Sequence, residues 1–88
     1  MMGQPLPSSA VHIKRARRLS TTFPPGTLVM IEWDYGPEHG NPGIRSGTSS
    51  FTGVIDEYDK NGWLTAYSEE GVKLWVPTGG LRVHRVHT

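Results

Sequence analysis

Short apolar runs, each bounded by turn residues, follow one another from Phe23 to the end of the sequence. Their length and their β-branched and aromatic residues predict strands rather than helices. The strands are predicted over 27–35, 51–58, 63–68 and 72–77, with a last short strand within 81–87. The stretch 36–50 has four glycines, two prolines and no periodicity, so it is predicted to be a long loop. No helix of ordinary length is expected after Phe23.

The first 22 residues have a different character, with two early prolines and many serines and threonines. Only the ten residues 10–19 favour a helix, and an isolated helix of that length is marginal. Its apolar residues are not at a helical spacing: Val11, Ile13 and Leu19. We therefore predict a flexible arm over 1–22 and a folded domain over 23–88.

The net charge of +1 hides an asymmetry between these two parts. The arm contains four cations and no acid, whereas the rest has five cations against eight carboxylates. A cluster of this kind binds phosphates by releasing counterions and does not read sequence. The cations of the arm are Lys14, Arg15, Arg17 and Arg18. Near the C-terminus, further residues could extend a positive patch: Arg82, His84, Arg85 and His87.

Five short strands with a long first loop and tight later turns predict an all-β protein closed into a small barrel. The order GTLVMIEW, FTGVIDEY, NGWLTAYSEEGVKLWVP and LRVH resembles SH3-like barrels of the KOW and Tudor type over residues 23–86. In those barrels a Gly-Val pair such as Gly53-Val54 opens the second strand, and a "VP…L" stretch joins the fourth to the fifth. The resemblance implies a five-stranded SH3-like β-barrel behind the flexible basic arm. It implies no function, because such barrels have many.

The stretch GWLTAYSEEGVKLWVP holds two of the three tryptophans and reads as a hairpin. A turn at Glu69-Glu70-Gly71 would place residues whose numbers sum to about 140 opposite one another. The pairs on one side are small and aliphatic: Ser68 with Val72, Ala66 with Leu74, and Leu64 with Val76. The other side pairs Tyr67 with Lys73 and Thr65 with Trp75, and has Trp63 diagonal to Trp75. We predict that the aliphatic side faces the core and that Trp63, Tyr67, Lys73 and Trp75 face outward. Two alternatives stay open for these rings: they form a stacking surface for a partner, or the basic arm or the loop at 36–50 folds over them.

The facing of the strand at 51–58 stays open. A type I turn with a glycine bulge at 59–62 would turn Val54, Asp56 and Tyr58 inward. A two-residue turn at Asn61-Gly62 would instead turn Phe51, Ile55 and Glu57 inward.

Catalytic and metal chemistry have weaker support. The stretch GTLVMIEWDYGPEHGNPGIR resembles the start of MazF-type ribonucleases, which implies a catalytic role for Arg45, although Ser46 stands where that family has proline. The matching residues are Gly26, Asp34, Pro37, Gly40, Gly43 and Arg45. His84 and His87 fall on opposite faces of a strand, and no four ligands converge. We predict no catalytic residue, no metal site and no cofactor.

The sequence also has no cysteine and no apolar run of about 20 residues that would cross a bilayer, so a cytoplasmic protein without membrane contact is expected. The favoured hypothesis is a non-catalytic binding module, attached to RNA or DNA as an accessory regulatory factor. The arm and the outward-facing rings together would form its site. One alternative is a protein-interaction or assembly subunit, of the kind found in phages, whose arm meets an acidic protein surface. The other is the ribonuclease. A homo-oligomer stays open, because so small a barrel buries little apolar surface.

Overall fold

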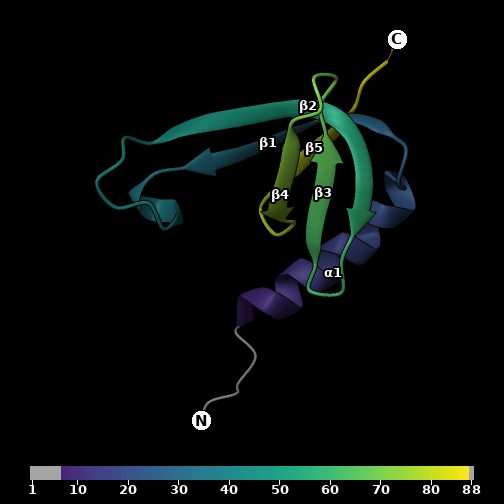
Figure 1. Cartoon of the computed structure of the whole chain (residues 1–88). Helices are drawn as coiled ribbons and strands as arrows, with labels where there is room; N and C mark the ends of the chain where they lie inside the picture. Colours follow the sequence, from purple (N-terminus) through teal and green to yellow (C-terminus); the bar gives the residue numbers. More distant parts are fainter. Residues whose placement is uncertain (1–6, 88) are drawn as a thin grey trace.

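The computed structural model describes residues 7–87, which form one helix, five strands and one short 3₁₀ turn (Figure 1). The elements in chain order are α1 (Pro7–Thr22), β1 (Leu28–Tyr35), η1 (Pro37–His39), β2 (Gly47–Tyr58), β3 (Trp63–Tyr67), β4 (Lys73–Pro77) and β5 (Arg82–Arg85). All five predicted strands are present, and within the described residues no helix longer than η1 follows Phe23.

The strands form one antiparallel sheet in the order β4-β3-β2-β1-β5, which is open. The predicted closed barrel is therefore wrong, as is the all-β class, because a 16-residue helix is part of the fold. Closure would require the edge strands β4 and β5 to find partners. β4 ends at Pro77, which has no N–H to offer, and β5 is only four residues long.

Strand β2 begins four residues earlier than predicted, because residues 47–50 pair with residues 32–35 of β1. The predicted long loop shrinks to 36–46. Together β1 and β2 make a long hairpin whose tip projects away from the rest of the molecule (Figure 1). At its end the ring of Tyr35 lies over Gly47, where any larger side chain would collide with it.

Strand β2 turns residues of both predicted alternatives toward the core: Tyr58 from one and Ile55 from the other. The turn at 59–62 is closed by a hydrogen bond from the N–H of Gly62 to the carbonyl of Asp59, and Gly62 has φ +84°. This is the turn with a glycine bulge, and Tyr58 points inward as it requires. A β-bulge between Ile55 and Glu57 then shifts the register, so Ile55 rather than Val54 is buried.

The core lies on one face of the sheet, opposite the exposed side chains of Val54, Tyr67 and Trp75. It consists of Val29, Ile31, Ile55, Leu64, Ala66 and Leu81. Phe23, Trp33 and Phe51 are among the partly buried residues that surround it. No helix of residues 7–87 is long and apolar enough to span a membrane.

Helix α1 crosses the end of the sheet where the β2–β3 turn lies (Figure 1), so the prediction of a flexible arm over 1–22 is wrong for residues 7–22. The first six residues of this arm lie outside the part of the chain that the structure describes. Ala16 and Leu19 are buried, and His12, one turn before Ala16, lies on the same side. The buried side consists of His12, Ala16 and Leu19, of which only Leu19 is a large apolar residue, so the spacing of large apolar residues does not reveal it. The helix is stable because it packs on the sheet, which a marginal isolated helix lacks.

Three contacts fix the N-terminal half of α1. The hydroxyl of Thr78, fully buried, donates to the carbonyl of His12 at 2.7 Å, and the N–H of Gly79 donates to His12 Nδ1 at 3.0 Å. Gly62 packs directly on the backbone of His12 and Ile13, with no room for a Cβ. Gly62, which was predicted only as a turn residue, therefore also allows the helix backbone to pack closely against the β2–β3 turn.

Candidate functional site

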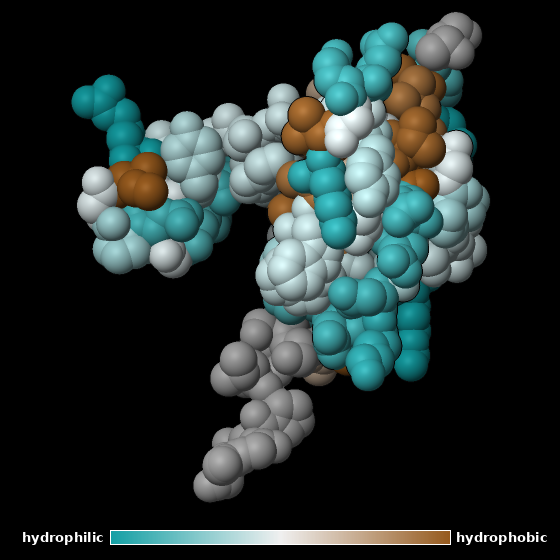
Figure 2. Space-filling model, viewed as in Figure 1, coloured by the Kyte–Doolittle hydropathy of each residue, from teal (hydrophilic) through white to brown (hydrophobic). Residues whose placement is uncertain are grey.

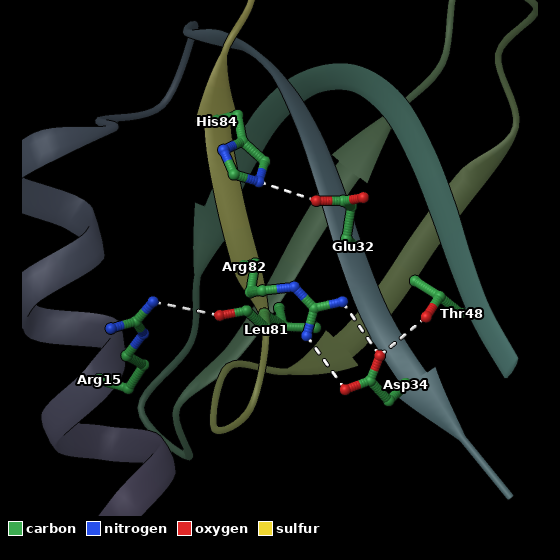
Figure 3. Close-up of polar contacts among 7 residues, drawn as sticks. All are labelled: Arg15, Glu32, Asp34, Thr48, Leu81, Arg82 and His84. Atoms are coloured by element: carbon green, nitrogen blue, oxygen red, sulfur yellow. Dashed lines mark hydrogen bonds and ion pairs between the residues drawn. The ribbon is translucent and has the colours of Figure 1, made fainter. Parts of the chain in front are cut away.

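The four cations predicted in the arm are divided by the helix into two groups. Lys14, Arg17 and Arg18 are exposed, and no ion pair within residues 7–87 involves them. Arg15 is half-buried, and its Nη2 donates to the carbonyl of Leu81 at 3.1 Å (Figure 3). Because residues three and four apart are neighbours on a helix, Lys14, Arg17 and Arg18 form one exposed group, here called the cationic stripe. Arg15 instead helps to hold the helix.

The β3–β4 hairpin has the predicted register, with Tyr67 opposite Lys73 and Thr65 opposite Trp75. The ring centroids of Trp63 and Trp75 lie 4.4 Å apart at an interplanar angle of 34°. Trp75 is 58% exposed and Tyr67 41%, whereas Trp63 is half-buried. The predicted outward facing is confirmed.

Val54 of β2 lies opposite Tyr67 and is 41% exposed on the same side of the sheet. Together these residues form the aromatic face, defined as Val54, Trp63, Tyr67, Lys73 and Trp75.

A carboxylate lies at one end of the aromatic face. Asp59 Oδ1 accepts the backbone N–H groups of Asn61 at 2.9 Å and Trp63 at 3.0 Å. The pKa of Asp59 lies below its usual value, chiefly because of the hydrogen bond from the Trp63 N–H. The Asn61 N–H and the indole of Trp75 lower it further. The negative charge next to the two tryptophans is therefore maintained at neutral pH.

Two more carboxylates lie at the opposite end. Glu69 and Glu70 are exposed in the β3–β4 turn and line an open cleft of about 550 Å³ with Val54 and Tyr67. Figure 2 shows the resulting pattern: strongly hydrophilic residues at the top and bottom of the front of the sheet, with less polar ones between them. The rings were predicted from the sequence, but the carboxylates that frame them were not. The available signal was the position of these carboxylates: Asp59 lies in the predicted turn before β3, and Glu69-Glu70 lies in the predicted turn after it.

The C-terminal cations do not form a free positive patch, since most have partners (Figure 3). Arg82 makes two hydrogen bonds to Asp34, at 3.0 and 3.1 Å, and His84 Nε2 lies 2.8 Å from Glu32. The bonds from Arg82 are the main cause of the lowered pKa of Asp34.

Arg85, the remaining cation of β5, is also engaged. It donates to the carbonyl of Thr22 at the end of α1 at 2.6 Å and lies over the ring of Phe23 at 5.5 Å. These pairings tie β5 to β1 and α1 rather than presenting charge to a ligand.

The residues singled out for chemistry are dispersed. Arg45 is exposed in the loop at the tip of the β1–β2 hairpin, while Asp34 is bound to Arg82 and accepts a bond from Thr48 at 2.9 Å. Within residues 7–87 no three histidine, cysteine or carboxylate groups come together as metal ligands. In comparisons with protein-family models, curated proteins and solved structures, none matches this chain.

Proposed function

We propose that this chain is a non-catalytic binding module that attaches to nucleic acid through the cationic stripe of α1. One observation carries the proposal: Lys14, Arg17 and Arg18 are exposed side by side on a helix whose opposite side is docked on the sheet. The resemblance to SH3-like folds adds nothing to it, because such folds serve many functions.

A docked helix is a better phosphate ligand than a flexible arm. Lys14, Arg17 and Arg18 lie within little more than one turn, roughly 6 Å along the helix axis. The backbone that carries them is already ordered, so binding does not cost the entropy of folding the segment. The two guanidinium groups also match the geometry of phosphate oxygens.

The aromatic face is left out of this nucleic-acid site, which revises the hypothesis that rings and cations act together. Asp59 stays ionised beside Trp63 and Trp75, and Glu69 and Glu70 stand at the other end. A phosphate backbone approaching these rings would meet like charge at both ends.

The test is a titration of labelled single-stranded RNA, single-stranded DNA and duplex DNA, followed by fluorescence anisotropy from low to raised salt. Three phosphate contacts on a single strand predict that log affinity falls with log salt at a slope of about −2. Arg17→Ala/Arg18→Ala should weaken binding by at least tenfold at low salt and flatten the slope. Arg45→Ala/Lys73→Ala removes the same charge from exposed positions outside the stripe and should change affinity far less.

Two results would contradict the proposal: no binding at low salt, or equal weakening by both double variants. A gel of the RNA after the titration also tests the ribonuclease hypothesis, under which cleavage occurs and Arg45→Ala abolishes it.

A further inference from the structure

The aromatic face is an apolar surface without a partner within residues 7–87. Val54, Tyr67 and Trp75 are each at least 41% exposed, and they come from three adjacent strands. Exposed apolar residues that lie together, framed by polar ones, are typical of an interaction surface. Aromatic residues in particular contribute strongly to such contacts.

The charge of this surface defines the kind of partner that fits. Glu69 and Glu70 frame one end and are the main acidic feature of this surface. At the other end Asp59 lies beside Trp63 and next to the exposed Lys60, while Lys73 is the face's own cation. Arginine and lysine side chains satisfy both parts of such a site: their stems cover rings and their charged heads pair with carboxylates. The partner is therefore a cationic protein segment with some apolar surface.

Helix α1 of the same sequence has this chemistry. Val11, Lys14 and Arg18 follow a three–four spacing along one side of the helix, and Val11 is 57% exposed. From Val11 to Arg18 the helix advances about 10 Å. From Trp63 to Tyr67 strand β3 advances about 13 Å, so the two surfaces have similar lengths.

We propose that the cationic side of α1 in one copy of the chain docks on the aromatic face of a second copy. Val11 packs against the exposed rings, and the cations of α1 lie near the carboxylates that frame them. The inference goes beyond nucleic-acid binding because it assigns the aromatic face. It also makes nucleic acid and a second copy competitors for the cationic stripe.

The contact is heterologous, since each copy uses two different surfaces. One copy can then bind a neighbour on each side, and assembly continues past the dimer. A single helix covers less than the roughly 800 Å² that each partner buries in a standard interface, so self-association should be weak, concentration-dependent and sensitive to salt.

Sedimentation velocity over a range of concentrations at low salt tests the proposal. The wild-type chain should sediment faster as concentration rises, and raised salt should reverse the change. Arg18→Glu damages the helix side and Glu70→Lys damages the face, so each should shift the association to at least tenfold higher concentration. Arg45→Glu and Glu38→Lys reverse the same charges at exposed loop positions outside both surfaces and should behave as wild type.

Mixing the two defective variants gives the sharpest result. Arg18→Glu retains an intact face and Glu70→Lys retains an intact α1, so mixing them should restore an association that neither variant shows alone at the same concentration. A monomeric wild-type chain at every concentration would overturn the proposal and leave the face to another protein. A mixture that forms no complex, or a Glu38→Lys variant as defective as Glu70→Lys, would overturn it too.

Failure here is distinguishable from failure of the nucleic-acid proposal. Glu70→Lys should shift self-association to at least tenfold higher concentration and leave RNA affinity intact or raised. If RNA binding is absent while self-association follows the pattern above, only the nucleic-acid proposal is lost.

Discussion

Helix α1 presents cations, whereas the aromatic face is framed by carboxylates, and the two surfaces hold their side chains in different ways. Lys14, Arg17 and Arg18 extend from the exposed side of α1 without an ion pair among residues 7–87. The rings of the aromatic face are fixed by strand register and by their own stack, 4.4 Å between centroids. One surface is suited to a mobile polyanion, and the other to a shaped protein partner.

Cations of the same type have different roles in the two regions. Arg15 lies among the stripe cations in sequence, yet it bonds the carbonyl of Leu81 and fastens the helix. Lys73 is also a cation, but it is an exposed residue of the aromatic face, opposite Tyr67 on β3. What separates these cations is the side of the element on which each lies.

The largest expected effect comes from separating α1 from the sheet at Gly62. An alanine there keeps the left-handed backbone at a cost of about 1–2 kcal/mol, and its Cβ overlaps the backbone of His12, which adds about 1–3 kcal/mol. Gly71→Ala is the matched control, since Gly71 has φ +83° but open space around it. Urea denaturation should show a clearly larger loss of unfolding free energy for Gly62→Ala. Equal losses would mean that α1 contributes nothing through this contact.

A smaller effect is expected from the buried hydroxyl that bridges α1 and the sheet. The Thr78 hydroxyl lies 2.7 Å from the carbonyl oxygen of His12 and 2.8 Å from that of Gly62, which share its single proton. Thr78→Val removes this shared hydrogen bond and should lower the unfolding free energy by about 1–3 kcal/mol. The exposed hydroxyl of Thr48 also makes one hydrogen bond, and Thr48→Val should cost at most about 0.5 kcal/mol. A Thr78→Val variant no less stable than Thr48→Val would contradict the importance of this contact.

Trp75 tests whether the two surfaces have separate ligands. Because it is 58% exposed, Trp75→Ala should change the unfolding free energy by less than about 1 kcal/mol. RNA affinity should stay within about twofold, since phosphates are expected only at the stripe. Self-association should weaken, and Trp75→Phe should restore part of it by returning a ring. Loss of RNA affinity in Trp75→Ala would show that nucleic acid reaches the rings, and the division of the two surfaces would fail.

The sequence predicted the β3–β4 hairpin best, because its pattern alternates without interruption. The pairs Ala66–Leu74 and Thr65–Trp75 follow from the turn alone, and both are observed. Strand β2 was harder, since its bulge before Glu57 changes the side that each residue faces. A bulge depends on the neighbouring strand and leaves no periodic signal.

Helix α1 and the acidic frame could not be predicted by the same reasoning. The helix is stable through contacts with residues more than 60 positions away, such as Thr78 and Gly79. Its buried side relies on small and polar residues that a hydrophobicity pattern ignores. Likewise Asp59 lies at the end of the aromatic face only because its turn brings it to Trp63.

The effect that is absent at neutral pH is an alkaline one at the C-terminal end of α1. Burial raises the pKa of Tyr58 to about 12, and its hydroxyl donates to the carbonyl of Phe23 at 2.6 Å. Since the unfolded phenol has a pKa near 10, the stabilisation is complete below pH 10 and is lost as pH rises through about 12. Tyrosinate absorbance and urea denaturation across this range should show late ionisation together with falling stability.

Tyr58→Phe provides the control for that titration. It removes both the late-ionising group and the bond to Phe23, so its unfolding free energy should be lower at neutral pH and should fall less between pH 10 and 12. The effect should leave the Trp63–Trp75 stack unchanged, because the aromatic face lies on the other side of the sheet from Tyr58. An equal alkaline loss in Tyr58→Phe would place its origin elsewhere. A change in tryptophan emission with the same midpoint would instead mean that the α1 end and the aromatic face respond as one unit.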